Sequence, residues 1–312
     1  MTDLSRRGVL GAALAGTAAA LPAASASAQT RHAAPAPLPA PADPTPRAVV
    51  YFASERFDDL MWENDRTAHR IYGHALQANE PPSGSGVDVW GKKVRWPYMQ
   101  RMLSTGAYHV DHGEGVDFYE VGGTRGCGGL GVWYDDKLWC SRNFVAHRIL
   151  ETGGQAARFE VDYAPWPVDV IRKVSETRAF SLPLGSNFTR MTSTLTSDSD
   201  APLTVGIGIA RRKPAAPASA IVRDATTGEL SVWGPAATEG TIGITIKVDP
   251  ASVAGFAQDA DNYLILITVQ PGKPFSYYVG AAWDGGQDFQ TQTEWQAHVS
   301  DRRFMFDGPT RR

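Results

Sequence analysis

The sequence predicts a large antiparallel β-sandwich that ends in a short C-terminal helix. Three observations favour this fold class. Glycine and proline are frequent, with 31 and 21 residues in a chain of 312, and both residues mark turns. The second half contains closely spaced runs of β-branched and aromatic residues, which are typical of strands. No helical period separates these runs, so we expect consecutive strands to pair antiparallel.

Seven strands are predicted in the second half of the chain. Each is an apolar, β-branched or aromatic run that is bounded by Gly, Pro, Asn or Asp. We expect this half to form a supporting sheet, and the functional cleft to lie in the first half, which carries most of the histidines. The predicted strands cover residues 172–184, 188–197, 203–210, 229–234, 241–249, 263–269 and 275–283.

The last element of the chain has helical features. Thr291 and Glu294 stand three residues apart, which is the spacing of a capping box. Trp295 and Val299 follow four residues apart, so both apolar side chains fall on one face of a helix. We therefore expect a short helix from about residue 293 to residue 304.

A glycine-rich segment, residues 126–131, matches the pattern G-x-G-x-x-G. A dinucleotide site needs this pattern to open a helix, whereas the residues that follow predict a β-hairpin with its turn at 135–136. We expect the glycines to allow a sharp bend or a close backbone approach instead. In the hairpin register Cys140 lies opposite Gly131, which disfavours a disulfide with Cys127.

The N-terminus has the pattern of a signal peptide over residues 1–28. Arginines at 6–7 precede a weakly apolar run, and an A-x-A cleavage site follows at 26–28. Alanine and proline dominate residues 29–47, which predicts an extended tether, and a single β-sandwich domain is expected over 48–312. We expect a periplasmic or secreted protein that does not contact the membrane after signal cleavage.

Charge and cysteine content exclude several classes of function. Thirty Lys and Arg against 33 Asp and Glu give a net charge of −3, so no basic excess points to nucleic acid. Two cysteines exclude a disulfide scaffold and a four-cysteine zinc module.

The richest polar segment is residues 108–117, with two histidines and three acids. If the segment is extended, His112 and Glu114 project from one face and His109 from the other. A carboxylate beside a histidine fixes the tautomer and raises the basicity of the ring, so His112 and Glu114 are predicted to transfer protons. Two alternatives stay open: a divalent metal held by His109, His112 and Glu114, or a polar loop with a structural role.

A second dense segment covers residues 62–73. As a strand it would place Arg66, Arg70 and Tyr72 on one face, whereas in a helix the two arginines would repel each other. Arginine binds carboxylates through its bidentate fork, and tyrosine can exchange a proton. Aromatic rings and nearby acids suit a sugar cleft. The predicted substrate-binding residues are Arg66, Trp90, Glu63 and Asp65.

These segments resemble those of a family of exported bacterial proteins catalogued only as a domain of unknown function. Members are typically found with enzymes that degrade pectin-like, alginate-like and ulvan-like uronic acid polymers, and the resemblance implies a mutarotase-like β-supersandwich. His69 stands where the family pattern has an aromatic or apolar residue, so it is a poor candidate for a shared catalytic role. The residues that carry the resemblance are WENDRTAHRIYG, SGVDVW, YHVDHGEGVDFYEVG, GCGG and YYVGAAW.

We expect an enzyme that acts on uronic-acid-containing oligosaccharides by β-elimination, as a lyase or a dehydratase. The reaction needs a group that neutralises the substrate carboxylate, a base for the C5 proton and an acid for the leaving oxygen. Arg70 and His112 must therefore face the same cleft. The residues predicted for the three roles are, in order, Arg70 with Arg66, His112 with Glu114, and Tyr72 or His109.

Two other functions fit the same residues. A glycoside hydrolase would pair Glu114 with a second carboxylate about 5–10 Å away. An epimerase-like or non-catalytic sugar-binding protein would rest on fold analogy alone. An oligosaccharide is the expected partner in all three cases. The candidates for the second carboxylate are Glu63, Asp65, Asp88 and Asp117.

Overall fold

The computed structural model describes residues 36–169, 172–212, 220–236 and 239–306. The predicted signal peptide and the first part of the tether, residues 1–35, lie outside the described residues. The described residues belong to one compact unit. None of the described helices is long and apolar enough to cross a membrane.

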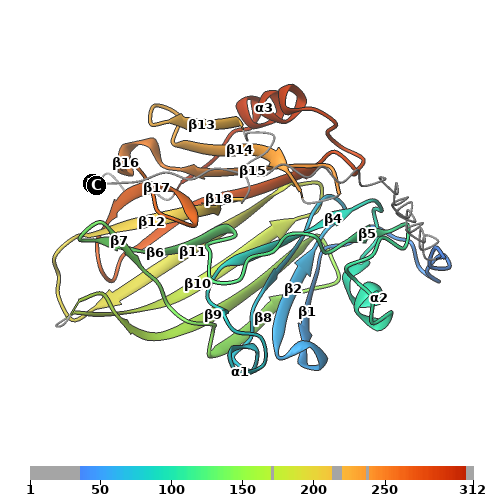
Figure 1. The fold of residues 1–312 in the computed structure, drawn as a ribbon, viewed down its shortest axis with the longest axis horizontal. Helices are drawn as coiled ribbons and strands as arrows, with labels where there is room; N and C mark the ends of the chain where they lie inside the picture. Colours follow the sequence, from blue (N-terminus) through green and yellow to red (C-terminus); the bar gives the residue numbers. More distant parts are fainter. Residues whose placement is uncertain (1–35, 170–171, 213–219, 237–238, 307–312) are drawn as a thin grey trace, which may run out of the picture. The chain divides into compact units, whose positions relative to one another are not determined.

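Within the described residues, three antiparallel sheets make up the fold (Figure 1). The first sheet contains the first five strands in chain order, and each strand pairs with the next. Two neighbouring strands of this sheet, residues 59–63 and 68–71, form a hairpin that includes Trp62. Its strands are β1 (Val49–Ala53), β2 (Asp59–Glu63), β3 (Ala68–Ile71), β4 (Val87–Lys92) and β5 (Gly115–Val116).

The second sheet is the largest, with eight strands in the order β13-β14-β15-β18-β11-β10-β9-β8. Side chains along its central strands alternate between the core and the opposite face. In the same order, its strands are Ala220–Asp224, Glu229–Pro235, Thr241–Val248, Pro274–Trp283, Phe188–Ser197, Lys173–Pro183, Ala156–Pro167 and Ala146–Glu151.

The third sheet has five strands in the order β16-β17-β12-β6-β7. Its β6–β7 hairpin turns at Asp135 and Asp136, which both have left-handed backbone angles, with φ of 53° and 52°. Cys140 lies beside Gly131 as the register predicts, and both cysteines are free thiols. In the same order, the strands are Val253–Gln258, Asn262–Val269, Leu203–Ala210, Cys127–Tyr134 and Lys137–Trp139.

The first and third sheets both pack against one face of the large sheet. Trp62 of β2 contacts the rings of Phe159 and Phe180 at centroid distances of 5.2 Å. From the third sheet, Gly128 approaches Val279 so closely that a Cβ atom there would lie 2.3 Å from a valine methyl group. One large hydrophobic core therefore joins all three sheets.

Helix α3 (Gln292–Asp301) covers the opposite face of the large sheet. The predicted capping box is present, since Thr291 and Glu294 exchange side-chain-to-backbone hydrogen bonds. Trp295 is buried and donates to the Thr245 hydroxyl of β15 at 2.9 Å. The helix ends earlier than predicted because Arg302 has extended backbone angles. Two shorter helices lie among the first strands, α1 (Leu76–Asn79) and α2 (Met99–Ser104).

The predicted fold class is confirmed, and all seven strands predicted for the second half are present. The extended conformation considered for residues 108–117 does not form, because only Gly115 and Val116 belong to a strand and the preceding residues form turns and bends. Residues 62–73 are two strands rather than one, with a turn at 64–67. The described end of the tether, residues 36–47, is bonded to the domain, since Leu38 donates to the His112 carbonyl at 3.0 Å.

Candidate active site

A cavity of about 590 Å³ lies beside the first sheet, whose central strand, β3, contributes Arg70 to the lining. We call it the Arg70 cavity. Its volume lies within the range of small-molecule sites in proteins. The lining combines two arginines, one histidine, four acids and three aromatic rings with smaller residues. The residues that line it are Arg56, Arg70, Tyr72, Leu76, Glu80, Pro82, Ser83, His109, Asp117, Phe118, Tyr119, Glu120, Val121, Gly122 and Glu239.

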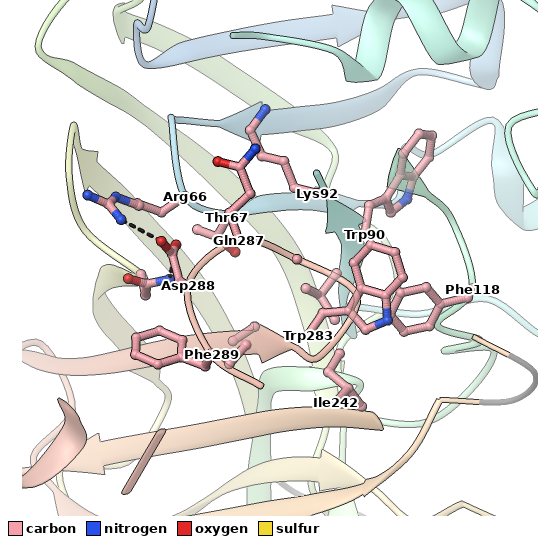
Figure 2. A pocket seen from close by; sticks show the side chains of 15 residues that line it. Arg66, Thr67, Trp90, Lys92, Phe118, Ile242, Trp283, Gln287, Asp288 and Phe289 are labelled. Atoms are coloured by element: carbon pink, nitrogen blue, oxygen red, sulfur yellow. Dashed lines mark hydrogen bonds and ion pairs between the residues drawn. The ribbon is translucent and has the colours of Figure 1, made fainter. Parts of the chain in front are cut away.

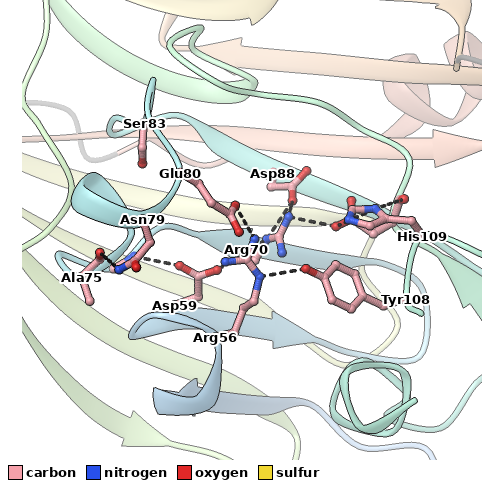
Figure 3. Close-up of polar contacts among 12 residues, drawn as sticks. Arg56, Asp59, Arg70, Ala75, Asn79, Glu80, Ser83, Asp88, Tyr108 and His109 are labelled. Atoms are coloured by element: carbon pink, nitrogen blue, oxygen red, sulfur yellow. Dashed lines mark hydrogen bonds and ion pairs between the residues drawn. The ribbon is translucent and has the colours of Figure 1, made fainter. Parts of the chain in front are cut away.

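Arg70 of β3 is the centre of the polar groups around this cavity (Figure 3). Its guanidinium donates to Oδ2 of Asp88 at 2.6 and 2.9 Å and to Oδ2 of Asp117 at 2.9 Å. A third carboxylate, Asp59, lies 3.9 Å away. All four side chains are almost completely buried. Three carboxylates therefore surround one cation in an environment of low dielectric.

Burial changes the protonation of these groups. Desolvation raises the pKa of Asp59 to about 7, although the charge of Arg70 opposes the shift. Desolvation also raises the pKa of Asp88 and of Asp117, again against the attraction of Arg70. One arginine cannot neutralise three carboxylates, so the cluster retains protons at a pH where exposed aspartates are ionised. Such a cluster can donate protons as well as accept them.

His109 is oriented by Asp117. Its Nδ1 lies 3.0 Å from the Asp117 carbonyl oxygen and 3.6 Å from the carboxylate of the same residue. A carbonyl oxygen only accepts, so Nδ1 carries the hydrogen, and the neutral ring has its lone pair on Nε2. The side chain is 65% exposed. His109 therefore presents a proton acceptor to the cavity from an anchored ring.

Arg56 forms another part of the cavity wall. Its Nε donates to the Tyr108 hydroxyl at 2.8 Å and its Nη2 to Glu80 at 2.7 Å. Nη1 is shielded from solvent and has no hydrogen-bond partner among the described residues. The Tyr108 ring lies against His109, with centroids 4.4 Å apart. Arg56 and His109 are therefore held by the same tyrosine.

Tyr72, Phe118 and Tyr119 supply aromatic surface to the Arg70 cavity. Burial raises the pKa of the Tyr72 hydroxyl well above its ordinary value, so the group stays protonated. The Arg70 guanidinium lies 5.2 Å from the centre of the Tyr72 ring. Aromatic faces beside polar groups suit a sugar ring, which has apolar C–H faces and polar hydroxyls.

The structure separates His112 and Glu114 from this cavity, since neither residue lines it. His112 contacts the carbonyl oxygens of Ala36 and Ala107 at 3.4 and 3.3 Å. Glu114 binds the Arg101 guanidinium with both oxygens, at 3.0 and 2.9 Å. The predicted pairing rested on an extended strand, and the turns that replace the strand send the two side chains to other partners.

The divalent metal considered for His109, His112 and Glu114 lacks a suitable donor set. Among the described residues, no group of three or more His, Cys, Asp or Glu side chains has an arrangement that could hold a metal ion. His109 points into the Arg70 cavity, whereas Glu114 is bound to Arg101.

Arg66 lies in the turn after β2 and not beside Arg70. It binds Asp288 at 2.5 Å (Figure 2) and Asp65 at 3.1 Å. The cavity next to it, about 30 Å³, has room for a water molecule and not for a sugar. Trp90 is buried beneath Arg70 and donates to Asp88 at 3.2 Å.

Glu63 has a structural environment. Its Oε1 accepts hydrogen bonds from the backbone nitrogens of Tyr98 and Met99 at the start of α2, and its Oε2 lies 2.6 Å from Lys92. His69, the residue that departs from the family pattern, is buried between Thr67 and the Asp88 carbonyl. Burial lowers the pKa of His69 to about 4, so the ring stays neutral.

Sequence reasoning missed Asp59, Arg56 and Glu80 as parts of the site. Asp59 begins β2 and Arg56 lies in the short 3-10 turn before it. Their order along the chain does not reveal that both face Arg70. The sequence pointed to Asp117 only as a possible second carboxylate of a glycoside hydrolase, and the structure places it in the cavity lining.

Solved structures with partial similarity come from carbohydrate-active enzymes. Heparan sulfate lyase HepC from Pedobacter heparinus matches 70% of this chain at 10% identity, with a TM-score of 0.36. The α-galactosidase AgaA from Geobacillus stearothermophilus matches 73% at 12% identity, with a TM-score of 0.34. The chain spans only 33% and 41% of these two proteins.

Comparison with protein sequences is more informative than these structural similarities, because it identifies a family. An uncharacterized protein, P7, from Formosa agariphila is 30% identical over 277 residues, which are 83% of this chain and 68% of that protein. Residues 15–311 match the family model of a domain of unknown function, DUF4861. The match extends over nearly the whole chain, and the chain therefore belongs to the DUF4861 family.

Proposed function

We propose that this protein is a carbohydrate-active enzyme that cleaves uronic-acid-containing oligosaccharides by β-elimination in the Arg70 cavity. One observation carries the proposal: His109, Tyr72 and Arg56 line the same cavity, and Asp117 anchors both His109 and Arg70. The predicted export of the chain would place this reaction in the periplasm or outside the cell.

His109 is the proposed base. Its Nδ1–H is held by the Asp117 carbonyl, so Nε2 can take the proton from C5 of the sugar. As that C–H bond breaks, its electron pair forms the double bond between C4 and C5, and the C4–O bond breaks. Tyr72 donates its proton to the departing oxygen, because its raised pKa keeps the hydroxyl protonated before the reaction.

Arg56 replaces Arg70 as the group that neutralises the substrate carboxylate. Both guanidiniums have an Nη1 without a partner among the described residues, but Arg70 already binds two carboxylates, Asp88 and Asp117. Arg56 binds one carboxylate, Glu80, so its Nη1 is the proposed contact for the substrate. A carboxylate placed there would satisfy this nitrogen and stabilise the negative charge that develops when C5 loses its proton. Arg70 is a positioning residue that holds Asp117, and through it His109.

The test is turnover of a panel of uronic oligosaccharides, read by mass spectrometry and by the ultraviolet absorbance of an unsaturated product. We expect His109→Ala to lower kcat/KM about 10²- to 10⁴-fold, the usual contribution of a general base. His112→Ala is the matched control, because this histidine lies outside the cavity and should retain activity. Full activity in His109→Ala, or its loss in His112→Ala, would contradict the proposal.

Hydrolysis is the second candidate, and the charge of the cavity favours it. Four acids (Glu80, Asp117, Glu120 and Glu239) line the cavity with only two arginines, which suits a neutral sugar better than a polyanion. Asp117, with its raised pKa, would protonate the glycosidic oxygen. Products that have gained water, without new ultraviolet absorbance, would identify hydrolysis.

A further inference from the structure

The Arg70 cavity continues into a second hollow of about 530 Å³. The two share four lining residues, so they form one groove and not two separate sites. The second hollow also includes Thr124 and the pair Arg211 and Arg212. The shared residues are Pro82, Glu120, Val121 and Gly122.

Arg212 is unusual among the residues of this hollow. Its guanidinium lies over the Tyr119 ring, 4.1 Å from the centroid. The Tyr119 hydroxyl donates to the Gly126 carbonyl at 2.9 Å, which fixes the ring beneath the guanidinium. Nε and Nη2 of Arg212 are shielded from solvent and have no partner among the described residues. The neighbouring Arg211, in contrast, donates to the Asp259 carbonyl.

A shielded guanidinium with unpaired nitrogens is costly unless a ligand or water satisfies it. Arginine presents two parallel N–H groups that match the two oxygens of a carboxylate. Because Tyr119 lines the Arg70 cavity and Arg212 lines the second hollow, the contact between them lies at the junction of the two.

We propose that the second hollow is a sugar subsite, in which Arg212 binds the carboxylate of the uronic acid unit adjacent to the one at His109. This inference rests on the proposed function and makes it more specific: the substrate is an oligomer with consecutive uronic acids. Stacking on Tyr119 holds the guanidinium in place before binding, so less conformational entropy is lost when the substrate arrives.

The experiment measures calorimetric binding to His109→Ala, with and without Arg212→Gln. The ligands are a uronic trisaccharide, the same trisaccharide with its carboxyls reduced to alcohols, and a single uronic acid. We expect Arg212→Gln to weaken binding of the uronic trisaccharide about 10- to 100-fold, the value of a charge-assisted hydrogen bond. The other two ligands should bind equally to both proteins.

Arg223→Gln is the matched control, because Arg223 is an exposed arginine of β13 outside the groove. It removes the same charge and should leave every affinity unchanged. Trisaccharide binding that is equal with and without Arg212→Gln, or an equal loss for the reduced trisaccharide, would overturn the subsite. If wild type turns over no substrate and Arg212→Gln still weakens the trisaccharide selectively, the proposed function fails and the subsite stands.

Discussion

Arg70 carries one positive charge among three buried carboxylates, and this ratio controls the chemistry of the cavity. A lone arginine in a strand suggests a clamp for a substrate carboxylate. In the folded protein the Arg70 guanidinium already donates hydrogen bonds to Asp88 and Asp117. The role left for Arg70 is to hold these acids in place and to stabilise the ionised form of each, against the desolvation that raises its pKa. The residue type correctly indicated that Arg70 binds carboxylates, but these carboxylates belong to the protein itself and not to a substrate.

The raised pKa of Asp59 predicts how stability depends on pH. Between the ordinary value of 3.8 and the folded value of about 7, the folded protein retains a proton that the unfolded chain releases. The folded state then binds more protons, so Asp59 lowers stability as pH rises through this window. An asparagine side chain does not titrate. We expect Asp59→Asn to gain about 2–4 kcal/mol relative to wild type between pH 4 and pH 7.5.

The measurement is urea unfolding of both proteins across this pH range. Asp58→Asn is a suitable control, because Asp58 neighbours Asp59 in the chain and lies outside the buried cluster. A stability difference between wild type and Asp59→Asn that does not change with pH would show that Asp59 titrates normally in the folded state.

At the scale of elements, short sequence patterns correctly predicted the structures that form between residues close together in the chain. The capping box at Thr291 and the hairpin turn at 135–136 depend on residues within a few positions of each other. The segment 108–117 lacks such a signal. Its alternation suggested a strand, but glycines with left-handed backbone angles, Gly106 and Gly113, bracket the turns that form instead.

Helix α3 offers a prediction at this scale. Thr291→Ala removes the side-chain acceptor of the Glu294 backbone nitrogen. We expect a loss of about 1 kcal/mol, which corresponds to a fall in Tm of about 2–4 °C for a chain of this size. Thermal unfolding measures the effect. Thr293→Ala, one position inside the helix, should be neutral or stabilising, since alanine has the higher helix propensity. Equal Tm values for Thr291→Ala and wild type would exclude a capping contribution.

At the scale of the whole molecule, Asn64 joins two sheets. It lies in the turn after β2, and its amide nitrogen donates to the carbonyls of Pro183, the last residue of β10 in the large sheet, and of Ser186, at 2.6 and 2.8 Å. Its amide oxygen accepts from the backbone of Arg66 and Thr67. One buried side chain therefore closes a turn and fastens it to a segment more than one hundred residues away.

We expect Asn64→Ala to destabilise the protein by about 2–4 kcal/mol, because it leaves buried carbonyl and amide groups without partners. Urea unfolding measures the loss. Asn79→Ala, which removes an exposed asparagine whose amide nitrogen donates to the nearby Ala75 carbonyl, should change stability by about 0.5 kcal/mol or less. A loss in Asn64→Ala no larger than in this control would mean that the turn is not fastened through Asn64.

The sequence by itself determined the antiparallel β class, the strands of the second half, the β6–β7 hairpin and the C-terminal helix. These features arise from side-chain periodicity and turn chemistry, which act between near neighbours. It also placed Arg70, Tyr72 and His109 among the candidate residues. Only the tertiary structure decided which histidine faces the cavity. Asp59, Asp88 and Asp117 surround Arg70 from three different parts of the chain, and burial, not spacing, sets their protonation. The packing of distant segments brings such groups together, and a linear pattern does not encode that packing residue by residue.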